Sequence, residues 1–248
     1  MAGHSKWANI KHRKAAQDKK RGKIFTRLIR EIMTAARHGG GDIASNPGLR
    51  LAVDGARAEN MPKDTIERAI KRGTGEIEGA DYVEVVYEGY GPGNVAMMVK
   101  CLTDNKTRTV ANVRAAFGKN GGRFGEAVAW MFDQKGIILY PSSIGAEDDV
   151  MEAAIEAGAD DVIVEAEGYE VHTAIEDFAT VRDALEAKFG KAEEADLGFI
   201  AKNETPITDE EKATTLMKLV NALEDDDDVQ SVTTNADFDD AVMQAMAS

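Results

Sequence analysis

The spacing of apolar residues divides the chain into a helical first part and a mixed second part. In residues 20–37, apolar side chains recur at intervals of one, three and four, which is the pattern of an α-helix with one buried face. Three glycines then stop this helix, and prolines that favour a first helical turn open two more, over residues 46–60 and 62–73. The pattern therefore predicts a three-helix unit within residues 17–73.

From residue 82 the apolar positions alternate with a period of two, which is typical of β-strands. The elements predicted first are strand, strand, helix and strand, at 82–88, 95–102, 106–118 and 128–132. Near the C-terminus the pattern predicts one more helix and one more strand, at 209–223 and 229–234. The apolar face of this last helix would stay unburied in an isolated tail, so we expect the pair to return and complete the first sheet.

Between these two groups lies a set of elements that needs no other partner. It is predicted as strand, helix, strand, strand, helix and strand, at 137–140, 146–157, 161–165, 169–173, 178–189 and 195–201. The order βαββαβ is that of a complete ferredoxin-like unit. We therefore expect residues 137–203 to be inserted into the domain that flanks them.

Together these elements predict an α+β protein of three domains. A basic helical domain, in which an N-terminal arm precedes a three-helix bundle, is expected at residues 1–78. A discontinuous α/β domain is expected at residues 79–135 and 205–248, and an inserted α/β domain at residues 136–204. Both α/β domains are expected to be ferredoxin-like.

The composition is that of a globular chain with a reduced cysteine. Of its 248 residues, 43% are hydrophobic and 30% are charged, and no apolar run approaches the roughly 18 residues of a membrane span. The N-terminus lacks the apolar segment of a secretory signal. Cys101, the one cysteine, cannot form an internal disulfide and shares a strand face with apolar residues, so we expect it to be buried. The expected location is cytoplasmic.

Charge is distributed very unevenly along the chain. Residues 1–38 contain 11 Lys or Arg and 2 acids, which gives +9, and residues 1–72 contain 17 basic and 7 acidic residues, which gives +10. Because the whole chain carries −14, residues 73–248 carry −24. A basic end on an acidic body is typical of a module that binds a polyanion.

The cations of the first helix recur on the side opposite its apolar face, with few acids to pair with them. This pattern favours an outward-facing track for phosphate groups, although a solvated helix face gives a similar pattern. Trp7 in the arm suits stacking on a base or packing on the bundle. The candidate nucleic-acid-binding residues are Lys6, Trp7, Lys11, Arg13, Lys14, Lys19, Lys20, Lys23, Arg27, Arg30 and Arg37. A secondary basic set consists of Lys106, Arg108, Arg114 and Lys119.

The sequence carries no pattern that favours an enzyme or a metal protein. It has no nucleophile beside a base, no phosphate-loop lysine and no Cys/His metal set. The G-x-G-x-G of residues 89–93 precedes a strand rather than the helix that a dinucleotide site needs. Four consecutive acids at 225–228 cannot easily converge on a cation, so we expect a solvated turn there. No catalytic residue, metal ligand or cofactor is therefore predicted.

Several segments resemble the bacterial YebC family. Residues 1–18, MAGHSKWANIKHRKAAQD, and 21–25, RGKIF, carry its N-terminal signature. The other matching segments are 87–93 (YEGYGPG), 104–110 (DNKTRTV), 151–159 (MEAAIEAGA) and 224–232 (EDDDDVQSV). The resemblance implies a helical N-terminal domain and two α/β domains, the middle one discontinuous, in a cytoplasmic, non-enzymatic factor. Bacterial members are commonly labelled DNA-binding transcriptional regulators, whereas the mitochondrial relative is a translational activator and the family is tied to ribosomes stalled during elongation.

Two segments depart from the family pattern. The glycine-rich loop around residues 121–125 suits either an anion-binding site or a simple turn. The segment that continues from it to residue 128 is shorter than in the family pattern. The strand that ends at residue 235 lacks the Tyr-His pair that the family pattern has. Both departures concern the middle domain and leave the basic domain untouched.

Three classes of function were weighed. The favoured class is a regulatory factor that binds nucleic acid, and its Lys and Arg side chains suit phosphates better than base edges. This favours structured RNA on the ribosome, where shape and charge suffice, over the alternative of a sequence-tolerant DNA-binding transcriptional regulator. The second class, an enzyme, is disfavoured by the missing catalytic patterns. The third is a protein-interaction adaptor that acts through the acidic α/β domains. Nucleic acid is the expected partner, protein partners on the acidic domains are an added expectation, and a monomer without a membrane partner is expected.

Overall fold

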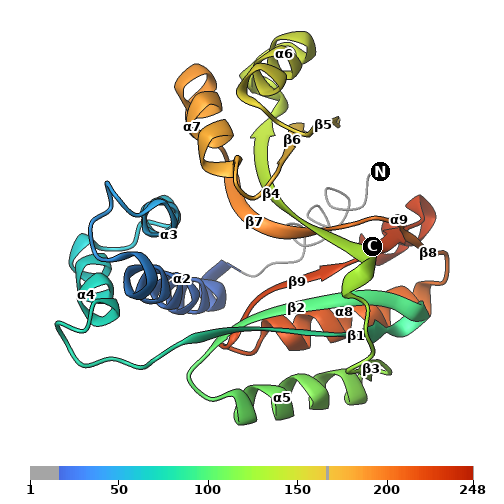
Figure 1. The fold of residues 1–248 in the computed structure, drawn as a ribbon. Coiled ribbons are helices and arrows are strands. Elements are labelled where there is room, and N and C mark those ends of the chain that lie inside the picture. The colour runs from blue at the N-terminus through green and yellow to red at the C-terminus, as the bar shows by residue number, and fades with distance from the viewer. Residues whose placement is uncertain (1–16, 166–167, 248) are drawn as a thin grey trace. The chain divides into compact units, whose positions relative to one another are not determined.

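The computed structural model describes residues 17–165 and 168–247 (Figure 1). Within them the chain forms two compact units. The main unit consists of residues 17–129 and 205–247, and the inserted unit consists of residues 130–204.

The main unit begins with the three predicted helices, α2 (Gln17–Gly39), α3 (Pro47–Ala58) and α4 (Lys63–Gly73). Asn46 caps α3, because its side-chain oxygen accepts a hydrogen bond from the Leu49 amide and its nitrogen donates to the carbonyls of Ala35 and Gly40. The apolar faces of the helices meet in one core, formed by Ile32, Met33, Ala36, Leu49, Ala52, Val53, Ala56, Met61, Ile66 and Ala69. The apolar period therefore predicted the helices and the face that each one buries.

A glycine is required where α4 ends against α2. A Cβ atom on Gly73 would lie 2.4 Å from the backbone carbonyl oxygen of Met33, which is far closer than such atoms approach. The missing side chain thus lets the two helix backbones come together at this point. Any larger residue at position 73 would force the helices apart.

A four-stranded antiparallel sheet forms the rest of the main unit. Its chain order is β1 (Val83–Gly91), β2 (Val95–Thr103), α5 (Lys106–Lys119), β3 (Arg123–Phe124), α8 (Glu210–Glu224) and β9 (Val229–Thr234). The strands lie in the order β3-β1-β2-β9, and β9 pairs with β2 in a register that places Val232 opposite Val99. The C-terminal helix and strand therefore complete the sheet that the earlier strands begin.

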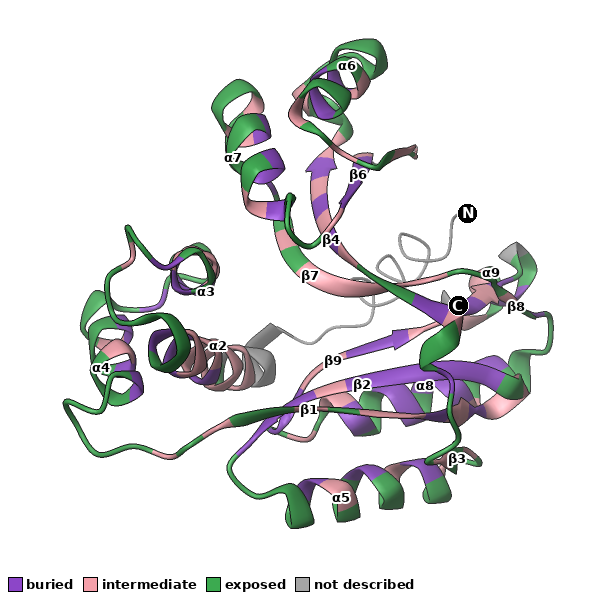
Figure 2. Cartoon of the chain, in the orientation of Figure 1, coloured by how far each residue is buried: buried purple, intermediate pink, exposed green. Residues whose placement is uncertain are grey.

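The apolar interior of this sheet lies along β2. Every residue of β2 except Lys100 is buried, as Figure 2 shows, and the helices α5 and α8 pack against each other and against the sheet. Cys101 is fully buried in this strand, as the alternation predicts. Burial and the nearby charges of Asp226 and Asp228 raise the pKa of its thiol to about 12. This thiol is therefore a packing residue rather than a nucleophile.

The predicted strand at 128–132 is wrong. Ala129–Met131 forms a 3₁₀ turn, and the third strand of the sheet is the two-residue β3. The Glu88 carboxylate accepts hydrogen bonds from the backbone amides of Val128 and Ala129, both at 2.7 Å. Because these amides are bonded to a side chain, they are not available to a strand ladder.

Three shorter elements complete the main unit. Strands β8 (Thr205–Ile207) and β10 (Ala236–Phe238) form a parallel pair, and the chain ends in α9 (Asp240–Ala247). Asn235 joins this pair to the sheet, since its side-chain oxygen accepts from the Ala96 amide and its side-chain nitrogen donates to the Thr205 hydroxyl. Asn235 is therefore a buried residue whose side chain connects β2, β8 and the end of β9.

The inserted unit contains the elements β4 (Phe132–Pro141), α6 (Glu147–Ala157), β5 (Asp161–Val164), β6 (Gly168–Thr173), α7 (Phe178–Phe189) and β7 (Glu194–Ala201). Its sheet has the order β5-β6-β4-β7 with every neighbouring pair antiparallel. This is the ferredoxin-like arrangement that the sequence predicts. The main-unit sheet has the same number of strands but connects them as ββαβαβ.

The α+β class is confirmed by these sheets and helices. The pairing of β2 with β9 is the contact that a discontinuous middle domain requires. The boundaries of the three domains, after residues 78, 135 and 204, stay predictions. Among the helices of the described residues, none has both the length and the apolar content needed to cross a membrane.

Candidate nucleic-acid interface

The candidate residues fall into three groups in the structure. Five of them, in the arm, lie outside the described residues: Lys6, Trp7, Lys11, Arg13 and Lys14. Lys19 and Lys20 belong to the first turns of α2, and their side chains are also outside the description. Lys23, Arg27, Arg30 and Arg37 are described, and they show what the basic face of α2 contacts.

Lys23 and Arg27 contact the acidic turn, residues 224–228, which joins α8 to β9. Lys23 Nζ lies 2.5 Å from the Asp225 carboxylate and donates a second hydrogen bond, of 3.0 Å, to the Asp225 carbonyl. Arg27 donates to the Glu224 carbonyl at 2.7 Å. Along the sequence, Asp225 lies 202 positions from Lys23, and Glu224 lies 197 positions from Arg27. The two ends of the main unit are therefore joined by opposite charges.

Arg30 is buried in the same contact, with only 9% of its surface exposed. Its guanidinium donates to the Asp228 carboxylate at 2.8 Å and to the Leu102 carbonyl at 3.1 Å, and also bonds the Asp227 carbonyl. The expectation that the basic stripe faces outward is therefore wrong at Arg30. The helix buries its apolar face in the core of the three helices. Part of its cationic face is also buried, because the acidic turn covers it.

Asp228 is the centre of this cluster, although the sequence predicts a solvated turn at 225–228. The residue is only 2% exposed, so that prediction is wrong at Asp228. Besides Arg30, it accepts hydrogen bonds from Arg108, from the Thr109 hydroxyl at 2.7 Å and from the Thr103 hydroxyl at 3.2 Å. Both threonines are fully buried. The carboxylate is thus surrounded by donors, as a buried charge requires.

The electrostatics of Asp228 follow from these contacts. Burial pushes its pKa up, but the hydrogen bonds from Arg108 and Thr109 and the charge of Arg30 outweigh burial and hold the pKa below 3.8. Arg108 also pairs with Asp104 at 2.8 Å, and these two carboxylates raise its own pKa. Arg108 therefore belongs to the buried cluster, and this separates it from the rest of the secondary basic set.

The contact between α2 and the acidic turn leaves several buried polar atoms without partners. Among the described residues no hydrogen-bond partner is found for the Nε atoms of Arg27 and Arg30, the Thr34 hydroxyl or the side-chain amide of Gln230. A buried donor or acceptor without a partner costs about 1–3 kcal/mol. The contact is therefore ionic, and some of its buried polar atoms lack hydrogen bonds to the described residues. The core of the helices, in contrast, is apolar.

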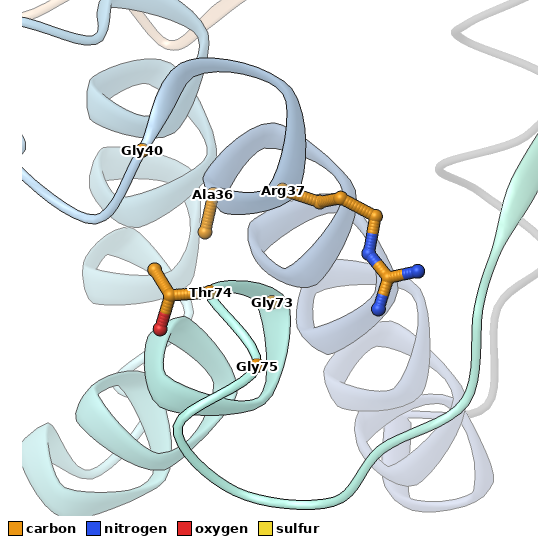
Figure 3. Close-up of a pocket in the computed structure, with 6 residues that line it drawn as sticks. All are labelled: Ala36, Arg37, Gly40, Gly73, Thr74 and Gly75. Atoms are coloured by element: carbon orange, nitrogen blue, oxygen red, sulfur yellow. The ribbon is translucent and has the colours of Figure 1, made fainter.

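Arg37 is the last described candidate, near the C-terminal end of α2. It forms an ion pair with Asp81 and lines a shallow pocket with Ala36, Gly40, Gly73, Thr74 and Gly75. Figure 3 shows its guanidinium extending away from Thr74. Because α2 and α4 both end at this pocket, their carbonyl ends give it partial negative charge. The pocket is therefore poorly suited to a phosphate.

The secondary basic set is spread along α5. The guanidinium of Arg114 lies 5.4 Å from the centre of the Phe124 ring, and Lys106 and Lys119 are exposed near the two ends of the helix. Arg108 is exposed on the same helix, but its guanidinium is bound to Asp228 and Asp104, so these positions do not form one cluster. Sequence reasoning missed the role of Asp228, because its only local signal was a run of acids after a helix.

Comparison with known proteins agrees with this architecture. The family model described as "TACO1/YebC protein N-terminal domain" matches residues 5–76, and that described as "TACO1/YebC second and third domain" matches residues 82–236. A probable transcriptional regulatory protein of Maridesulfovibrio salexigens is 56% identical, over 99% of each chain. One of the same description from Magnetococcus marinus is 54% identical, over 100% of each chain.

A solved structure is also similar along most of its length. The crystal structure of a conserved hypothetical protein from Aquifex aeolicus has a TM-score of 0.83 and 44% sequence identity, and the match covers 90% of this chain and 93% of that one. The relatives that carry a functional name are named as regulatory proteins rather than as enzymes. The two family models together span the helical domain and both α/β domains, and the chain belongs to the TACO1/YebC family.

Proposed function

We propose that this chain is a non-enzymatic regulatory factor that binds nucleic acid through its basic N-terminal domain, and that its target is RNA on the ribosome. The observation that carries the proposal is the segregation of charge. Residues 1–38 hold +9, whereas residues 130–204 contain 5 Lys or Arg against 19 Asp or Glu, a net charge of −14 that equals that of the whole chain. A phosphate backbone is attracted to the first segment and repelled by the second. The regulatory names of the relatives support the same class of function.

Contacts within the main unit reduce the number of Lys and Arg side chains that we assign to phosphate binding. Arg30 and Arg108 are bound to Asp228, and Arg37 is paired with Asp81. We assign the phosphate contacts to Lys6, Lys11, Arg13, Lys14, Lys19, Lys20, Lys23 and Arg27, with Trp7 stacking on a base. Lys106, Arg114 and Lys119 stay a secondary set, spread along α5.

RNA is favoured over DNA by the type of side chain. Lys and Arg bind the backbone of any sequence, and structured RNA is recognised largely by its shape and its backbone. The names of the relatives, probable transcriptional regulatory proteins, instead favour the DNA alternative, in which the protein is a sequence-tolerant transcriptional regulator. Crosslinking in cells, followed by sequencing of the attached nucleic acid, separates the two targets. Ribosomal RNA reads would support the proposal, and promoter DNA would replace it with the alternative.

An adaptor role is the second candidate function, and the charge of the inserted unit favours it. This unit carries −14, and the first turn of α6 alone contains Glu147, Asp148 and Asp149, all exposed. Such a surface suits a basic protein partner rather than nucleic acid. Purification from cells with nuclease treatment tests this role, since a protein partner that stays bound after nuclease digestion does not depend on RNA.

A further inference from the structure

We propose that the acidic turn, residues 224–228, competes with nucleic acid for Lys23 and Arg27 of α2, so that full binding requires these two side chains to leave the turn. This regulation rests on the proposed function, since it concerns the same basic helix. Asp228 and Arg30 stay together as the anchor of the turn, while Lys23 and Arg27 exchange one set of oxygen atoms for another.

The contacts have the chemistry of a phosphate site that is already occupied. Lys23, Arg27 and Arg30 are spaced by four and three residues, which places them along one side of the helix. Their partners are carboxylate and carbonyl oxygens of the acidic turn. A phosphate would offer the same cations charged oxygens in place of these, and hydrogen bonds to charged oxygens are stronger than those to a neutral carbonyl.

The contacts of the three cations are graded in strength along the helix. Arg30 and Asp228 are both buried, with side-chain exposures of 11% and 3%. The side chains of Lys23 and Asp225 are 36% and 77% exposed, and an exposed pair of this kind contributes little to stability. The Lys23 end of the contact can therefore open while the Arg30 end stays closed.

Arg27 is the residue with most to gain from a new partner. Its Nη2 atom donates a hydrogen bond to the neutral carbonyl of Glu224, while its buried Nε has no partner among the described residues. A guanidinium binds a phosphate through two parallel hydrogen bonds, which would use the Nε that the turn leaves unbonded. When a phosphate replaces the turn, the Nε atom of Arg27 therefore gains the hydrogen-bond partner that the turn does not provide.

Two substitutions in the turn separate this competition from general electrostatics. Asp225→Asn removes the carboxylate that Lys23 contacts, whereas Asp227→Asn removes the same charge from an exposed side chain that contacts no cation among the described residues. Affinity is measured by fluorescence anisotropy on the full chain with a labelled RNA hairpin and with duplex DNA. We expect Asp225→Asn to bind about two- to fivefold more tightly than Asp227→Asn, from the usual strength of an exposed ion pair.

A double substitution and a conformational readout complete the test. In a Lys23→Gln background, Asp225→Asn should give no advantage over Asp227→Asn, because the competing pair is already gone. Hydrogen exchange of the wild-type chain should show faster exchange in residues 224–230 when the RNA hairpin is bound. Equal binding of the two turn variants, or stronger protection of the turn in the complex, would overturn the competition and leave the proposed function standing. If neither wild type nor any variant binds RNA or DNA, both proposals fail.

Discussion

The main unit and the inserted unit use acidic residues in opposite ways. In the main unit Asp228 is 2% exposed, and two arginines and two threonines donate to it. In the inserted unit a pair such as Lys135–Asp160 lies in partly exposed surroundings, and the excess of acids has no internal cations to balance it. Asp228 therefore holds the fold of the main unit together, whereas most described acids of the inserted unit are exposed and give its surface their charge. Loss of a buried, paired acid therefore lowers the free energy of unfolding more than loss of an exposed one.

Substitution of the two acids should give the largest contrast. Asp228→Ala leaves Arg30, Arg108 and two buried hydroxyls without their acceptor, so we expect the free energy of unfolding to fall by about 3–5 kcal/mol. Asp160→Ala, the control in the inserted unit, should lower it by less than about 1 kcal/mol. Urea unfolding of each variant measures both values. Similar losses for the two variants would show that burial does not distinguish these acids.

Acid should weaken the main-unit cluster in a defined range of pH. The pKa of Asp228 is lower in the folded chain than its ordinary value, so its contacts stabilise the fold fully above the unfolded pKa of about 3.9. This stabilisation is lost as the pH falls through the folded pKa, because the proton then binds in both states. We expect the stability gap between wild type and Asp228→Asn to be constant from neutral pH to about pH 5 and to narrow below about 3.9. A gap that persists unchanged in strong acid would assign the stabilisation to something other than the charge.

Salt should produce the smallest effect and should distinguish Asp160 from Asp228. About 1 M NaCl shortens the screening length to about 3 Å, which weakens pairs that water reaches. The small loss caused by Asp160→Ala should therefore shrink towards zero, whereas the loss caused by Asp228→Ala should remain, since that carboxylate is buried. Thermal unfolding at low and high salt measures both. Screening of the Asp228 effect would contradict a buried cluster.

The sequence predicts most of the fold because local periodicity records which face of each element is buried. It predicts the helices of the basic domain, the ferredoxin-like order of the inserted unit, and the return of α8 and β9 from the apolar face of α8. It does not predict β3, because a strand of two residues is too short to show alternation. The 3₁₀ turn at Ala129–Met131 was missed because the acceptor for the preceding amides is a distant Glu88.

The charged contact could not be predicted for a similar reason. Arg30 and Asp228 are separated by 198 positions, and a cationic helix face looks the same in sequence whether it meets solvent, phosphate or an acidic turn. The missing acids on α2 did indicate that its charge is balanced from outside the helix. Only the fold shows that part of this balance comes from the same chain, at residues 224–228.

The salt dependence of RNA binding tests the central claim, that the basic end of the chain engages phosphates. Each phosphate contact contributes a slope of roughly −0.7 to −0.9 to log affinity against log salt. We expect the combined change of Lys11, Arg13 and Lys14 to Gln to reduce the slope by about two to three units. The matched change of Lys106, Arg114 and Lys119 to Gln, on α5, should leave it nearly unchanged. An unaltered slope in the first variant, or a larger loss in the second, would contradict the account.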